Sequence, residues 1–295
     1  MEAELIPADV RSRLKDLRLQ AVRVHGTQGI GQHPSHSRGA GLEFSQYRAY
    51  EPGDALRQID WKLYARSDKF FVREAERESP LTVWLLLDAS ASMGQVDQVR
   101  PHWSRLDAAK GIAACIAELA LRQGDRFGLA ALQATGLQLL PAGSGPRQRD
   151  RLWLALHALS AQGGAAGGEQ FNPVWERSTA GDMVVILSDC FDDAIVALAE
   201  RLAAARREVI VIQLLTAEER DFPFAGGHRF LDVESTTELA GDGKAMRDGF
   251  LARFGQALQT LEARLDAAGI RHARHVLDTP LDQPLQHLFG RRVPA

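Results

Sequence analysis

The most restrictive feature of this 295-residue chain is a continuous apolar run at residues 81–87 that ends abruptly in Asp88. A run of strand length without a polar interruption is typical of a central parallel strand that is buried on both faces. A second stretch of the same kind, residues 182–189, also closes on an acid, Asp189. Because open α/β sheets place their sites at the carboxyl ends of parallel strands, we expect the two acids to share one edge of a sheet.

Strand and helix patterns alternate over residues 81–215, which predicts an α/β fold with a doubly wound, mainly parallel sheet. The first helix is expected after Ser104, which forms with Asp107 the spacing of a capping box. Two strand-like segments, 126–133 and 136–140, are separated by only two residues. So short a link fits a hairpin, and the sheet should therefore carry one antiparallel edge strand.

Residues 1–80 depart from this alternation and are expected to form a small N-terminal α+β segment ahead of a larger domain at 81–295. Apolar residues recur at helical spacing over residues 9–24, which predicts an amphipathic helix. A loop is expected at 25–40, and strands are expected at 42–47 and 69–78.

Composition excludes several classes of function. The formal charge of −3 provides no electrostatic attraction for nucleic acid or for anionic lipid. The only two cysteines, Cys115 and Cys190, lie far apart, so we expect no disulfide framework and a reducing compartment. No stretch approaches the roughly eighteen apolar residues that a membrane span needs. The sequence therefore predicts a cytoplasmic protein without a membrane span.

The spacing of Asp88, Ser90 and Ser92 suits a single hydrated magnesium ion. Two hydroxyls, one or two carboxylates and several waters can complete the octahedron of oxygens that Mg²⁺ requires. Asp189, at the end of the neighbouring strand, is the expected second acid. The plain alternative is a strand end followed by a serine turn, because short motifs of this kind also recur by chance.

Enzymatic chemistry finds less support in the sequence. The chain contains no Walker-type phosphate loop, no Gly-x-Ser-x-Gly elbow and no His-Glu-x-x-His motif. A hydrolase that used Ser90 or Ser92 would need a histidine brought near by folding. An enzyme in which Asp88 and Asp189 serve as acid and base stays open as the alternative, although we expect no enzymatic activity.

These residues carry a resemblance to known families. Asp88-x-Ser90-x-Ser92 with Asp189 resembles the metal-ion-dependent adhesion site of von Willebrand factor A-type domains. Several further segments resemble the MoxR-associated bacterial proteins called domain of unknown function 58: residues 38–44, 50–54, 57–61, 65–66 and 88–93. The resemblance implies an A-type domain behind a family-specific segment, no enzymatic activity, and a role as adaptor or assembly factor beside MoxR-type AAA+ ATPases.

One position departs from the family pattern. A threonine after the glycine-rich loop is expected to supply another metal oxygen, but Glu169 stands there in this chain. Either Glu169 ligates the ion, directly or through water, or the site has lost its metal and the domain is a scaffold with a degenerate site. Because close carboxylates without a cation repel one another, we favour a retained Mg²⁺ or Mn²⁺.

The interpretation that follows is docking by coordination. A metal ion with one open position accepts an Asp or Glu from another protein, so binding depends on the ion and on charge at its rim. A second candidate contact consists of Arg48, Arg57, Trp61 and Arg66, because interfaces are enriched in Trp and Arg. The plain alternative for this second group is a packed surface patch held by Arg and Asp pairs.

Overall fold

The protein consists of two compact units, Val24–Pro80 and a larger one formed by Met1–Arg23 with Leu81–Ala295. The computed structural model describes residues 5–20, 44–51, 59–75, 80–133, 136–163, 172–231 and 238–290. The division after residue 80 coincides with the boundary expected from the sequence, but the first residues group with the larger unit. Leu19 is one residue that holds this segment to the larger unit, because its backbone N–H and carbonyl both hydrogen-bond to the side chain of Gln123, at 2.7 and 3.0 Å.

The small unit contains a two-stranded antiparallel sheet, β1 (Phe44–Ala49) with β2 (Phe71–Ala75). Both strands were expected. The helix α2 (Trp61–Ser67) lies between them in the chain. Asp60 starts this helix, because its carboxylate accepts hydrogen bonds from the first free backbone N–H groups of the helix. The loop expected at 25–40 lies outside the described residues.

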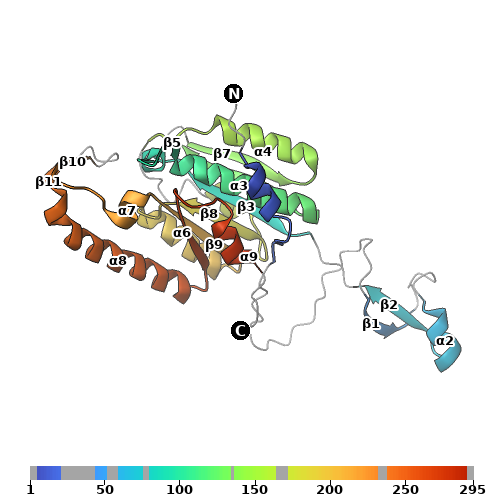
Figure 1. Ribbon diagram of the computed structural model, residues 1–295. Coiled ribbons are helices and arrows are strands. Elements are labelled where there is room, and N and C mark those ends of the chain that lie inside the picture. Colours follow the sequence, from blue (N-terminus) through green and yellow to red (C-terminus); the bar gives the residue numbers. More distant parts are fainter. Residues whose placement is uncertain are drawn as a thin grey trace. The chain divides into compact units, whose positions relative to one another are not determined.

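The larger unit is built on a six-stranded sheet in the order β12-β9-β8-β3-β6-β7 (Figure 1). Its strands are β3 (Thr82–Asp88), β6 (Arg126–Gln133), β7 (Gly136–Gly143), β8 (Met183–Ser188), β9 (Glu208–Leu215) and β12 (Arg271–Val276). Neighbouring strands pair in parallel except at one edge, where β7 runs antiparallel to β6. The predicted fold, a mainly parallel sheet with one antiparallel edge strand, is confirmed.

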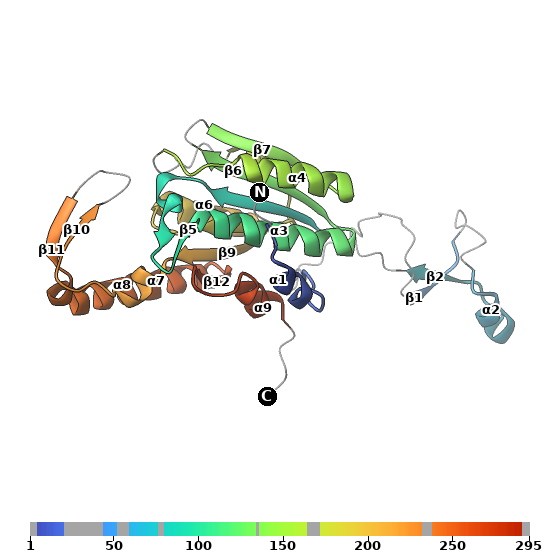
Figure 2. The ribbon, with the colours of Figure 1, turned by 45° about the horizontal axis from the view of Figure 1, so that its top comes forward.

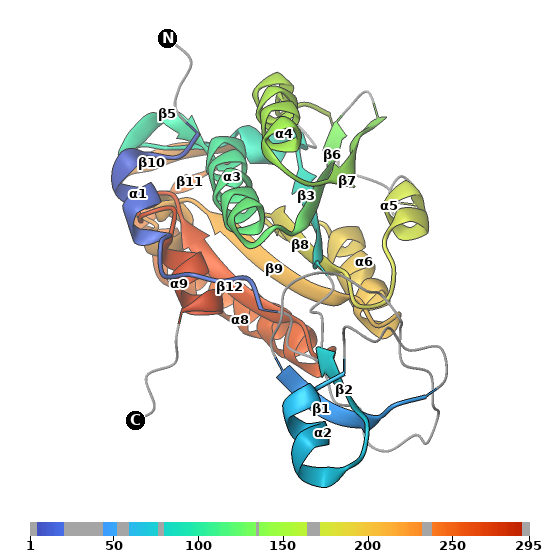
Figure 3. The same ribbon diagram turned by 90° about the vertical axis from the view of Figure 1, so that its right-hand side faces the viewer.

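Helices cover both faces of this sheet (Figure 3). The first face carries α1 (Ala8–Arg13), α3 (Arg105–Gln123), α4 (Pro146–Ala158) and α9 (Gln283–Phe289). The second face carries α5 (Asn172–Arg177), α6 (Asp193–Ala204) and α8 (Gly243–Ala267). Two apolar cores result, and alternate residues of β3 supply both of them: Val83, Leu85 and Leu87 on the first face, Trp84 and Leu86 on the second.

The start of α3 follows from its sequence. The hydroxyl of Ser104 accepts a hydrogen bond from the backbone N–H of Asp107 at 3.1 Å. The carboxylate of Asp107 in turn accepts from the backbone N–H of Ser104 at 3.0 Å. This reciprocal pair is the predicted capping box, and Gly124 in a left-handed conformation ends the helix.

Two small hairpins lie outside the six-stranded sheet. The first, β4 (Val96–Asp97) with β5 (Arg100–Ser104), follows the short helical turn η2 (Ala91–Gly94). The second, β10 (Gly227–Leu231) with β11 (Glu238–Asp242), follows α7 (Ala217–Asp221) and leads into α8 (Figure 2). None of the helices that the structure describes combines the length and the apolarity that crossing a bilayer requires.

The predicted N-terminal helix is too long. It was expected to span residues 9–24, but α1 ends at Arg13. Beyond it, the guanidinium of Arg122 donates to the carbonyls of Leu14 and Leu17, at 2.7 and 3.2 Å. These bonds satisfy carbonyl groups that a continuing helix would have used, so tertiary contacts override the local periodicity.

We predict that a buried histidine makes folding sensitive to acid. His275 in β12 is fully buried, and burial, helped by the charge of Arg100, lowers its pKa from 6.5 to about 4. Since the unfolded chain binds this proton more readily, stability should fall as the pH drops from about 6.5 to about 4, by up to roughly 3 kcal/mol. Urea unfolding at several pH values checks this. His275→Gln should flatten the dependence, and the exposed His287→Gln should not.

A second prediction concerns the packing of the central sheet. A Cβ added to Gly128 in β6 would lie 2.9 Å from backbone atoms of Leu140 and Ala142 and from the ring of Trp84. Gly128→Ala should therefore lower the free energy of unfolding by roughly 1–3 kcal/mol. The matched control is Gly255→Ala in α8, where the added Cβ would meet no atom within 4 Å outside the adjoining helix backbone, and helix propensity should instead add up to about 1 kcal/mol. Equal stability of the two variants would contradict the prediction.

Candidate functional site

The parallel pairing of β3 with β8 brings two acidic strand ends together. Leu87 lies opposite Leu187 in the register, so Asp88 and Ser188 follow at the same edge of the sheet. The hydroxyl of Ser188 donates a hydrogen bond to Oδ2 of Asp88 at 2.8 Å. Asp88 and Asp189 are only 5% and 3% exposed. The residues that the sequence singled out on separate strands thus meet in a nearly buried cluster.

The turn after β3 directs two hydroxyls toward each other. The backbone N–H of Ser90 donates to Oδ1 of Asp88 at 2.9 Å, which folds the turn back over the strand end. The hydroxyl oxygens of Ser90 and Ser92 lie 3.1 Å apart. Adjacent ligands of an octahedral magnesium ion, each about 2.1 Å from the metal, lie about 3.0 Å from one another. This spacing is that of a hydrogen bond between the two hydroxyls, and two adjacent ligands of the predicted magnesium ion would have nearly the same spacing.

Asp88 is held in a setting that favours a nearby cation. Burial raises the pKa of Asp88 above its usual range, and the charge of Asp189 acts in the same direction. Hydrogen bonds from Ser90 and Ser188 oppose the shift and fix both carboxylate oxygens in place. A positive charge placed beside this carboxylate would relieve the unfavourable burial of its negative charge.

Asp189 is engaged differently. Its Oδ1 accepts the backbone N–H of Phe191 at 3.1 Å, and its Oδ2 accepts Nη1 of Arg105 at 2.9 Å. The intervening Cys190 has a positive φ of 60°, so the chain turns sharply after the strand. Both carboxylate oxygens of Asp189 thus already have donors from the protein itself.

Arg105 is the site residue that sequence reasoning missed. It is the first residue of α3 and is 1% exposed. Its guanidinium also donates to the carbonyl of Ser92 at 3.1 Å, pairs with Glu219 in α7, and lies 5.3 Å from the ring centroid of Phe191. The sequence offered only a charged residue directly after a helix cap, with no local signal that its side chain is buried.

The donors present determine what kind of ion the site could hold. Within the described residues, no three His, Cys, Asp or Glu side chains converge as a metal site. A divalent ion would therefore rest on the hydroxyls of Ser90 and Ser92 with Asp88 as the nearest acid. Oxygen donors of this kind suit Mg²⁺ or Mn²⁺ rather than a thiol- or imidazole-seeking metal. Glu169, the other candidate ligand, lies outside the described residues.

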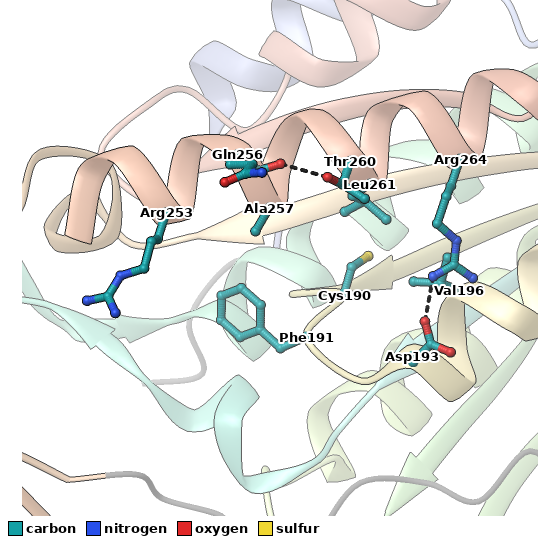
Figure 4. Close-up of a pocket in the computed structure, with 10 residues that line it drawn as sticks. All are labelled: Cys190, Phe191, Asp193, Val196, Arg253, Gln256, Ala257, Thr260, Leu261 and Arg264. Carbon is teal, nitrogen blue, oxygen red and sulfur yellow. Dashed lines mark hydrogen bonds and ion pairs between the residues drawn. The ribbon is translucent and has the colours of Figure 1, made fainter. Parts of the chain in front are cut away.

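A pocket of about 490 Å³ lies beside the acidic cluster, between the turn after β8 and helix α8 (Figure 4). Its lining consists of Cys190, Phe191, Asp193, Val196, Arg253, Gln256, Ala257, Thr260, Leu261 and Arg264. Neither Asp88 nor Asp189 lines it. Burial raises the pKa of the Cys190 thiol well above its ordinary value, so the thiol is a poor nucleophile.

The second candidate contact is placed only in part. Trp61, at the start of α2, is 56% exposed, and Arg66 in the same helix is exposed. The indole packs edge-on against Tyr64 and Phe70, which stack on one another with centroids 4.4 Å apart. Arg57 and the side chain of Arg48 lie outside what the structure describes.

Known proteins resemble this chain at several levels. Uncharacterized proteins of Mycobacterium tuberculosis and Mycobacterium bovis are each 28% identical to it over 225 residues, covering 75% of this chain and 70% of their own. Among solved structures, the SpRpn10 VWA domain matches at 14% identity, covering 73% of this chain and 100% of that one, with a TM-score of 0.44.

A further solved structure, the conserved hypothetical protein BatB from Bacteroides thetaiotaomicron, matches at 16% identity and a TM-score of 0.40. It covers 64% of this chain and 98% of its own. A family model aligns with residues 46–259 and so takes in the strand-end cluster and most of the small unit. The chain belongs to this family, described as protein of unknown function DUF58.

Proposed function

We propose that this chain is a non-enzymatic protein-interaction module that binds an acidic side chain of a partner through a divalent ion. The ion, Mg²⁺ or Mn²⁺, would sit at the adjoining ends of β3 and β8. The observation that carries the proposal is the pair of hydroxyl oxygens of Ser90 and Ser92, 3.1 Å apart, beside the buried carboxylate of Asp88.

Hydrogen bonds from the protein itself fix the acid of the proposed site. Each oxygen of Asp88 receives one hydrogen bond from the protein, so the side chain cannot rotate away from the hydroxyl pair. Each carboxylate oxygen keeps a second lone pair, which can accept a metal-bound water. An ion held by Ser90 and Ser92 keeps positions for exchangeable ligands, and a carboxylate from another protein could take one of them.

The enzymatic alternative fits the described residues less well. Acid and base catalysis by Asp88 and Asp189 would need a substrate-sized cavity into which both acids open. The pocket beside the acidic cluster is lined by residues from the turn after Asp189, from α6 and from α8, and includes neither acid. The matching family is described as being of unknown function, so it assigns no reaction to the chain.

A scaffold without metal is a second candidate function. One observation favours it, namely the ion pair between Arg105 and Asp189, which already supplies that acid with a positive partner. In that case the strand-end cluster would be structural, and partner capture would survive the loss of Asp88.

The partner that we propose is a MoxR-type AAA+ ATPase in the cytoplasm, with this chain as its adaptor or assembly factor. This proposal rests on the sequence segments that resemble the MoxR-associated bacterial proteins, because the matching family model is itself of unknown function. The exposed Trp61 and Arg66 in α2 would provide a further contact that does not involve the ion.

Metal titration tests the site directly. In calorimetry with Mg²⁺ and Mn²⁺, we expect heat from the wild type and an affinity reduced roughly tenfold or more in Asp88→Ala and Ser92→Ala, because each removes an oxygen ligand or its charge. Glu169→Thr tests whether the glutamate also contributes. Ser12→Ala, an exposed serine in α1, is the matched control and should bind like the wild type. No heat from the wild type would contradict the metal-based proposal.

Partner capture tests the docking step. The immobilised chain should retain a MoxR-type ATPase from native lysate in the presence of Mg²⁺ and release it in EDTA. In the presence of Mg²⁺, Asp88→Ala should capture less than the wild type, provided that its melting temperature in EDTA matches that of the wild type. Capture that is indifferent to EDTA and to Asp88→Ala would support the metal-free scaffold instead.

A further inference from the structure

Arg105 is a charged residue in an unusual place. Its side chain is 1% exposed, so its positive charge is almost entirely removed from water. A buried guanidinium is tolerated only where acids and hydrogen-bond acceptors compensate it. Here Asp189 accepts from Nη1 at 2.9 Å, and Glu219 accepts from Nη2. The structure therefore supplies two carboxylates to one arginine.

The same guanidinium contacts both segments that form the candidate metal site, the turn after β3 and the end of β8. Besides Asp189 at the end of β8, Nη1 donates to the carbonyl of Ser92 at 3.1 Å, in the turn that carries the two hydroxyls. Nε of Arg105 has no hydrogen-bond partner among the described residues. Arg105 thus places a fixed positive charge inside the same acidic cluster that would hold a divalent ion.

Glu219 is held where it can balance this charge. Its Oε2 accepts the backbone N–H of Thr216 at 2.9 Å, and its own backbone N–H donates to the hydroxyl of Thr216 at 3.2 Å. This capping box fixes the glutamate at the start of α7. Because the cap anchors Glu219 independently of Arg105, its carboxylate stays beside the cluster when the arginine is replaced.

We infer that Arg105 is the built-in counter-ion of Asp189 and sets the affinity of the strand-end site for divalent metal. An ion at Ser90, Ser92 and Asp88 is then held without direct ligation by Asp189, and it binds against the repulsion of the guanidinium. This inference deepens the proposed function, since it concerns the same ion site. If the inference holds, the affinity of the site for a divalent ion depends on residues 105 and 219 together.

Two substitutions with opposite expected effects on the affinity for Mn²⁺ test the inference. Binding of Mn²⁺ alone is measured by calorimetry and by electron paramagnetic resonance, on the full chain after EDTA treatment. Arg105→Met removes the positive charge but keeps an apolar stem, and should raise the affinity for Mn²⁺ roughly tenfold or more. Glu219→Gln keeps a residue that can form the capping box but leaves the arginine less compensated, and should lower the affinity several-fold.

The outcomes separate this inference from the proposed function. If Arg105→Met is folded by circular dichroism and binds Mn²⁺ no more tightly than the wild type, the inference is overturned while wild-type binding keeps the proposed function. If only Arg105→Met binds, the inference stands and metal-dependent docking by the wild type fails. If neither binds, both fail. Should Arg105→Met not fold, Glu219→Gln decides, and an affinity equal to or above that of the wild type overturns the inference.

Discussion

The in-register parallel pairing of β3 with β8 is the constraint on which the strand-end cluster depends. Because both strands are buried on both faces, neither can slip by one residue without moving its apolar side chains out of the two cores. Asp88 and Ser188 are therefore held opposite each other, and the hydrogen bond between them follows from the sheet itself. The chemistry of this edge depends on apolar packing several residues away.

Charge balance imposes a second constraint on the same edge. Asp88, Asp189 and Arg105 are all nearly buried, and Glu219 is only partly exposed. Three elements meet through these side chains: the turn after β8, the start of α3 and the start of α7. Removing any one of the charges leaves another without compensation in a region of low dielectric. The cluster thus holds these three elements together and is also a candidate binding site.

Much of this architecture could be predicted from the sequence because it depends on local patterns. The capping box of Ser104 and Asp107 needs only residues three apart. The buried strands β3 and β8 are recognised by their uninterrupted apolar runs. The role of Arg105 could not be predicted, since its partner Glu219 lies 114 positions away. For the same reason the early end of α1 escaped prediction, because Arg122 reaches it from a distant helix.

The antiparallel edge strand β7 has a consequence for how copies of this protein meet. An outermost strand normally presents a row of unpaired amide groups that another chain can use to extend the sheet. Pro141 lies exposed within β7, next to the irregular register between Phe127 and Leu129 of β6, and it has no amide hydrogen to offer. A second copy that added a strand at this edge would find the hydrogen-bond ladder interrupted at Pro141, so extension of the sheet there is disfavoured.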